Sequence, residues 1–70
     1  MEDNNLKQQI TDLLRANPTK RFRVEDVSDA LGYHGSAAFK LIVQEFARLE
    51  REEIAVVTSE GEFQLNEKAR

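Results

Sequence analysis

Residues 54–65, with the sequence IAVVTSEGEFQL, restrict the fold of this chain more than any other stretch. IAVVT is rich in β-branched residues, Gly61 supplies a turn, and EFQL alternates polar and apolar side chains, so the stretch predicts a β-hairpin. A two-stranded hairpin is at best marginally stable in water by itself. We therefore expect Val56, Phe63 and Leu65 to pack on the apolar face of the helix that precedes them.

That helix is predicted over residues 36–53, SAAFKLIVQEFARLEREE, with Ser36 as its N-cap. At about 100° per residue, apolar side chains fall on one side of the helix and polar ones on the other. The apolar side is expected to carry Phe39, Ile42, Val43, Phe46 and Leu49. The opposite side is expected to carry Lys40, Gln44, Arg48 and Arg51.

A first helix is predicted over residues 4–17, NNLKQQITDLLRAN. Asn4 or Asn5 can act as its N-cap, and Pro18 ends it. The apolar residues at helical spacing are Leu6, Ile10, Leu13 and Leu14.

A second helix is predicted within VEDVSDALGY, residues 24–33. It ends at Gly32, which adopts the left-handed conformation without penalty, and Tyr33 can complete a Schellman cap. The preceding TKRFRV, residues 19–24, is either a short strand or an extended lead-in. The face of the helix that is expected to be apolar carries Val24, Val27, Ala30 and Leu31.

The order of these elements predicts an α+β fold of the winged helix-turn-helix type, with three helices and a C-terminal β-hairpin wing. The second and third helices are joined by only a few residues around Gly32 and Gly35. The alternative, a three-helix bundle with a disordered end, would leave the β-branched IAVVT in water. We place the winged-helix domain at residues 1–66 and assign residues 67–70 to a tail or the start of a linker.

The composition limits the classes of function. Seventy residues suffice for one small domain, and the formal net charge of -3 argues against binding nucleic acid by overall charge. The chain has no cysteine, which favours the cytoplasm. It also has no apolar run long enough for a membrane span, so no membrane partner is expected.

No group of side chains predicts catalysis. His34 has neither a cysteine nor a second histidine with which to bind zinc, and Ser36 has no base at a meaningful spacing. Glu52 and Glu53 are neighbours that point about 100° apart on a helix. We expect neither a catalytic site nor a cofactor in this chain.

The polar side of residues 36–53 is the first candidate for contact with nucleic acid. In the alternative interpretation this side is only solvated, and Arg48 pairs with Glu45 and Glu52, three and four residues away. The candidate residues are Lys40, Gln44, Arg48 and Arg51.

The second candidate is the basic segment TKRFR, residues 19–23. Lys20, Arg21 and Arg23 surround Phe22, which makes this the densest group of cations in the chain. In the alternative interpretation these cations protect the edge of a sheet from pairing with another chain.

Two stretches, VEDVSDALGY and FARLEREEIAVVTSEGEFQL, resemble the winged-helix module at the amino end of ribonuclease R, a bacterial 3′-to-5′ exoribonuclease. In that family a helix ending in Leu-Gly precedes a long helix ending in arginine, leucine and glutamate, and a hairpin with a glycine turn follows. The matching positions here are Leu31-Gly32, residues 48–51 and Gly61. The resemblance covers the chain from the first helix to Leu65.

The resemblance implies an accessory role in binding or opening structured RNA, with weak, auxiliary affinity. It also implies that the magnesium-dependent catalytic domain lies outside this chain, and that other domains of the parent are further partners. Glu53 departs from a common family glycine, and Glu60 and Glu62 replace the usual cations of the wing tip. Because phosphate repels these acids, we expect the RNA contacts to come from residues 36–53 or 19–23. We also expect the domain to act as a monomer.

Two other functions fit the same fold. One is the DNA-binding domain of a transcriptional regulator, which needs base readout by the third helix, where Ala37 and Ala38 offer little hydrogen bonding. The other is an acidic protein-interaction winged helix, suggested by the net negative charge and by Glu60 and Glu62.

Overall fold

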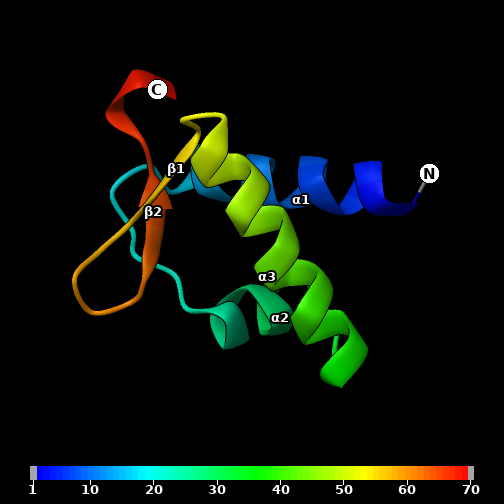
Figure 1. The fold of residues 1–70 in the computed structure, drawn as a ribbon. Helices are drawn as coiled ribbons and strands as arrows, with labels where there is room; N and C mark the ends of the chain where they lie inside the picture. The colour runs from blue at the N-terminus through cyan, green and yellow to red at the C-terminus, as the bar shows by residue number, and fades with distance from the viewer. Residues whose placement is uncertain (1, 70) are drawn as a thin grey trace.

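The computed structural model describes residues 2–69, with side chains from residue 6 onward. Helix α3 (Ser36–Arg51) packs against two other helices and the first strand of a hairpin, and helix α1 (Glu2–Ala16) also packs against the second strand (Figure 1). This arrangement confirms the α+β fold of three helices followed by an antiparallel hairpin. The elements in chain order are α1 (Glu2–Ala16), α2 (Val24–Leu31), α3 (Ser36–Arg51), β1 (Ala55–Val57), β2 (Phe63–Leu65) and the short 3₁₀-helix η1 (Glu67–Ala69).

The hairpin gains a third, single-residue strand from the segment before α2. Ala55 pairs with Leu65 and Val57 with Phe63 in the antiparallel ladder. Phe22 and Phe63 form an isolated bridge in which each backbone N–H donates to the other residue's carbonyl at 2.7 Å. The extended segment predicted at residues 19–24 is therefore held at the edge of the hairpin.

Helix α2 ends in a Schellman motif, as the sequence predicts. Gly32 has φ 64°, and its N–H donates to the Asp29 carbonyl at 3.2 Å. The N–H of Tyr33 donates to the Ser28 carbonyl at 3.0 Å, which completes the pair of bonds that defines the motif.

Helix α3 ends in the same way, but with a glutamate in the left-handed position. Glu53 has φ 63° and is the only non-glycine residue with positive φ among those described. Its N–H donates to the Glu50 carbonyl at 3.1 Å, and the N–H of Ile54 donates to the Leu49 carbonyl at 2.8 Å. Glycine would adopt this conformation without the steric penalty that a side chain brings.

Two predicted N-caps are wrong. Helix α1 begins at Glu2, so Asn4 and Asn5 lie inside the helix. Ser36 is the first residue of α3, and the N-cap is Gly35 with φ 108°, a conformation that side-chain-bearing residues rarely adopt. The chain therefore enters α3 one residue earlier than the serine suggests.

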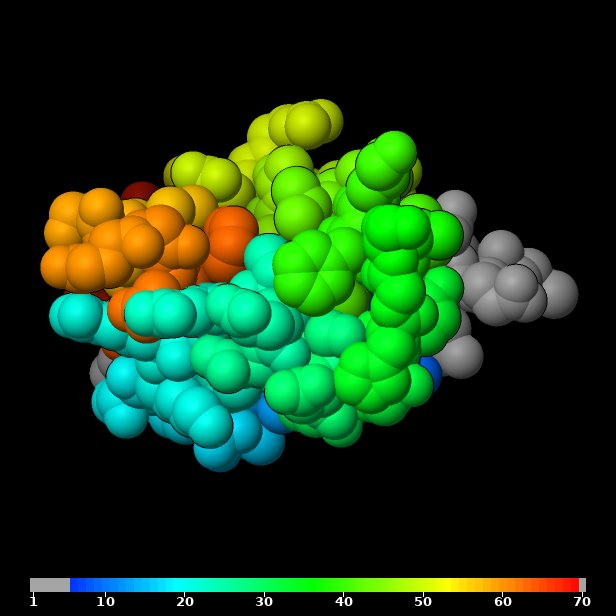
Figure 2. All heavy atoms as spheres, turned by 90° about the horizontal axis from the view of Figure 1, so that it is seen from below, coloured from blue at the N-terminus to red at the C-terminus, as the bar shows by residue number. Residues whose placement is uncertain are grey.

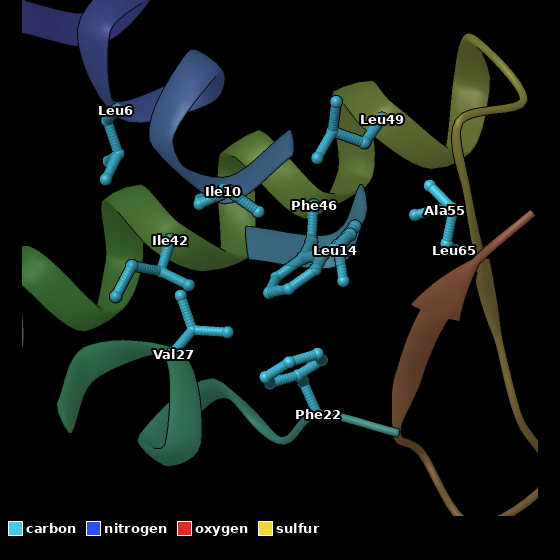
Figure 3. Close-up of a cluster of buried hydrophobic side chains, with 10 residues drawn as sticks. All are labelled: Leu6, Ile10, Leu14, Phe22, Val27, Ile42, Phe46, Leu49, Ala55 and Leu65. Atoms are coloured by element: carbon cyan, nitrogen blue, oxygen red, sulfur yellow. The ribbon is translucent and has the colours of Figure 1, made fainter. Parts of the chain in front are cut away.

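The core lies where the three helices and the hairpin meet (Figure 3). The rings of Phe46 and Phe63 stack with centroids 4.0 Å apart, which fixes the hairpin on α3. Ala69 of η1 also packs against the core, so the end of the described chain adds to the domain. The core consists of Leu6, Ile10, Leu14, Phe22, Val27, Ile42, Phe46, Leu49, Ala55 and Leu65.

Outside α3, two apolar residues that were expected in the core are exposed, Val56 and Ala30. Val56 points to the outer side of the hairpin with its partner Gln64, and the neighbouring Ala55 occupies the inner position. In α2, Ala30 is exposed and Ser28 is buried, because the Ser28 hydroxyl donates to the Tyr33 carbonyl at 2.6 Å.

Candidate nucleic-acid interface

The face of α3 that points away from the core carries all four predicted binding residues in exposed positions, and three of them have no acidic partner among the described side chains. Lys40, Gln44 and Arg51 are exposed, since this side of the helix has no packing partner. Among residues 6–69, no acidic side chain forms an ion pair with Lys40 or Arg51. These two charges are therefore available to an external anion.

Arg48 is different, because it has a partner inside the domain. Its Nη1 lies 3.5 Å from Oε2 of Glu45, whose side chain is only 2% exposed. The other oxygen of Glu45, Oε1, has no hydrogen-bond partner among the described side chains. The alternative pair of Arg48 with Glu52 is not formed, since Glu52 accepts from Lys7 at 2.7 Å. Arg48 is thus the least available of the four residues.

The basic segment of residues 19–23 lies against the tip of the hairpin. Nη1 of Arg21 is 3.7 Å from Oε1 of Glu60, and Nε of Arg23 is 3.4 Å from Oε2 of Glu62. The bridge between Phe22 and the hairpin places these side chains next to one another. In Figure 2, seen from below, the segment (cyan) lies beside the hairpin (orange).

These two ion pairs leave little net charge on the segment. Lys20 is the remaining cation, and its Nζ lies 5.0 Å from the centroid of the Phe22 ring in a cation–π contact. Exposed ion pairs contribute about 0.2–1 kcal/mol each, so an anion can compete for Arg21 and Arg23 only at that cost. The acidic wing therefore has a role within the domain, which the sequence alone did not reveal.

The side of α3 that is buried differs from the side predicted by the helical wheel. Phe39 is 40% exposed and Val43 is 47% exposed, although both were expected in the core. Ala38 and Glu45 are buried instead. The apolar arc of α3 is wider than the surface its neighbours cover, so one edge of it stays in contact with solvent.

The exposed apolar edge forms a shallow hollow next to the cationic face. The hollow has a volume of about 300 Å³ and is lined by Phe39, Lys40, Val43 and Gln44. The sequence signal that could have indicated it is the width of the apolar arc, which extends from Phe39 around to Leu49.

Neither a metal site nor a membrane-spanning helix is found in the part of the chain that the structure describes. Residues 6–69, whose side chains the structure describes, contain no group of three or more side chains that could hold a metal ion. Within residues 2–69, every helix is too short or too polar to cross a bilayer.

The described arrangement is that of a winged helix-turn-helix domain with a partly cationic third helix. Comparisons with known protein families, with curated proteins and with solved structures found no match for this chain. The resemblance to ribonuclease R stays a prediction from the sequence.

Proposed function

We propose that this chain is an accessory RNA-binding winged helix of a ribonuclease R-like 3′-to-5′ exoribonuclease. The observation that carries the proposal is the exposed face of α3, on which Lys40 and Arg51 have no acidic partner among the described side chains. Charged groups of this kind contact the sugar-phosphate backbone, which supplies most of the affinity of non-specific nucleic-acid binding.

Each residue of the face has a distinct role in this proposal. Lys40 and Arg51 are separated by about 16 Å along the helix axis and contact different phosphates. Gln44 lies between them and donates a hydrogen bond from its side-chain amide. Arg48 contributes less, because its guanidinium is shared with Glu45 at 3.5 Å.

We expect the affinity for RNA to be weak, because two of the three cations in residues 19–23 form ion pairs with Glu60 and Glu62. Other domains of the parent would supply the remaining affinity through effective concentration. The module would act as a monomer in the cytoplasm and assist the binding or opening of structured RNA. Hydrolysis and magnesium would belong to the catalytic domain of the parent.

The two alternative functions have less support from the geometry. Ala38 is buried, so the start of α3 offers base edges few hydrogen-bonding groups, which disfavours a sequence-specific DNA-binding regulator. A protein-interaction domain was suggested by Glu60 and Glu62, and both acids already pair within the domain.

An NMR titration of the isotope-labelled domain with a short RNA hairpin at low salt tests the proposal. We expect the largest shifts of backbone amides around Lys40, Gln44 and Arg51, and smaller ones in residues 19–23. Substituting Lys40→Gln and Arg51→Gln should weaken binding and reduce the salt dependence by about 0.7–0.9 per lost phosphate contact. Lys68→Gln is the matched control, because Lys68 pairs with Glu53 at the end of the domain. An absence of shifts on α3 would refute the proposal.

A further inference from the structure

The hollow on α3 combines two large apolar side chains that the core does not use. Phe39 and Val43 lie one helical turn apart and are 40% and 47% exposed. Single exposed apolar residues are common on protein surfaces, but these two line one hollow together with Lys40 and Gln44. The hollow therefore offers an aromatic ring, an aliphatic wall, an amide and an ammonium group in one place.

This set of groups matches the chemistry of a nucleotide. An exposed aromatic ring can stack on a base, and the amide of Gln44 can both donate to and accept from a base edge. Lys40 can pair with the adjoining phosphate. No carboxylate lines the hollow, so nothing within it repels a polyanion.

We propose that this hollow binds an unpaired base of single-stranded RNA, which stacks on the ring of Phe39 while Lys40 contacts its phosphate. The inference rests on the proposed RNA-binding function and restricts the preferred RNA to single strands. In a duplex, each base face is covered by the neighbouring base and cannot stack on the ring of Phe39. The module would thus favour a strand that has already been opened over an intact helix.

A second copy of this chain is a poorer occupant. Stable protein interfaces bury roughly 1,200–2,000 Å² in total, and the hollow has only two large apolar side chains to contribute. A base needs no more than one ring and one aliphatic wall.

The test uses three RNA probes and four proteins, with binding measured by fluorescence anisotropy at low salt. The probes are a single-stranded hexanucleotide, the same chain with abasic sites, and a blunt-ended duplex. The proteins are the wild type, Phe39→Leu, Lys40→Gln and Tyr33→Leu, the last being a matched control with a similarly exposed aromatic ring outside the hollow. Phe39→Leu keeps an apolar side chain at an exposed position, so the fold should be retained.

We expect Phe39→Leu to weaken binding of the hexanucleotide about fivefold or more and to leave duplex binding unchanged. Lys40→Gln should weaken binding of both the hexanucleotide and the duplex, and Tyr33→Leu should weaken binding of neither. In the wild type, the ring protons of Phe39 should shift upfield with the hexanucleotide but not with the abasic chain. This NMR readout needs no variant.

Other results separate the two proposals. Equal wild-type affinity for the hexanucleotide and the abasic chain, or an equal effect of Tyr33→Leu and Phe39→Leu, would overturn the base site while RNA binding by α3 stands. If the wild type binds none of the probes, both proposals fail. Self-association that Phe39→Leu abolishes in sedimentation would identify a second copy as the occupant and would overturn the base site.

Discussion

Nε of Arg23 lies 3.4 Å from Oε2 of Glu62, so a cation in the segment before α2 is paired with an acid of the hairpin. Arg21 and Glu60 form the corresponding pair at 3.7 Å. The acids of the hairpin thereby form ion pairs with cations of the same domain. This gives the two carboxylates a structural role at a position where a nucleic-acid-binding wing would carry lysine or arginine.

Neutralising these two acids should strengthen RNA binding. In the double variant Glu60→Gln/Glu62→Gln, Arg21 and Arg23 lose their partners and become available to phosphate, so we expect a several-fold lower Kd at low salt and a steeper salt dependence. The matched control is Asp12→Asn/Glu67→Gln, which changes the net charge equally at exposed positions away from this segment. Equal gains in both double variants would show that only total charge matters.

Phe22 should be critical for stability, because it belongs to the core and also forms the bridge to the hairpin. Its side chain is 2% exposed. We expect Phe22→Ala to lower the free energy of unfolding by about 3–5 kcal/mol, measured by urea denaturation. In hydrogen exchange of the wild type, the amides of Phe22 and Phe63 should be protected, since each donates at 2.7 Å. Rapid exchange at both would contradict the bridge.

Removing the buried carboxylate of α3 should stabilise the domain. Glu45 is 2% exposed and has one ion pair, to Arg48 at 3.5 Å. Glu45→Leu removes a buried charge with an unsatisfied oxygen and leaves Arg48, which is 52% exposed, to be solvated by water, so it should raise the free energy of unfolding by about 1–2 kcal/mol. Arg48→Ala should lower it by about 1–2 kcal/mol, because it leaves the carboxylate without a charged partner. Glu50→Leu, at an exposed position of the same helix, should have little effect.

Glycine at position 53 should also stabilise the domain. Glu53 has φ 63°, and the left-handed conformation costs a residue with a side chain roughly 1–2 kcal/mol, part of which is offset by the greater freedom of glycine in the unfolded chain. We expect Glu53→Gly to raise the free energy of unfolding by about 0.5–1 kcal/mol in urea denaturation.

The converse change, Gly32→Ala at the equivalent position of α2, should destabilise by about 1 kcal/mol. No atom beyond the adjoining residues lies within 4 Å of the added Cβ, so the substitution measures mainly backbone strain. Opposite signs for the two substitutions are the expected result, and equal signs would contradict it.

The local features of the fold could be predicted from the sequence because each has a local cause. The β-branched run of residues 54–58 and the turn at Gly61 indicate the hairpin, and Gly32 is typical of a helix end. The position of the helix-turn-helix follows from the short connection between α2 and α3.

The surface of the candidate site could be predicted only in part, since it depends on tertiary contacts. A helical wheel places Lys40 and Gln44 on the exposed side, but it does not tell which flank of a wide apolar arc the other elements cover. Exposure of Phe39 and Val43 therefore needed the structure. The pair of Arg23 and Glu62 also needed the structure, because the two residues are 39 positions apart in the sequence. The sequence did show the cluster of cations and the cluster of acids, but not that they pair.

The bridge between Phe22 and Phe63 has a consequence for the order in which the domain assembles. It joins two residues on either side of α2 and α3, so closing it restricts a long segment of chain, and we expect it to form late in folding. Mutations at the bridge should consequently change the unfolding rate far more than the folding rate, and release of the hairpin should require the protected bridge to break. Such a release would separate Glu60 and Glu62 from their arginines and increase the positive potential of the segment for as long as the hairpin stays open.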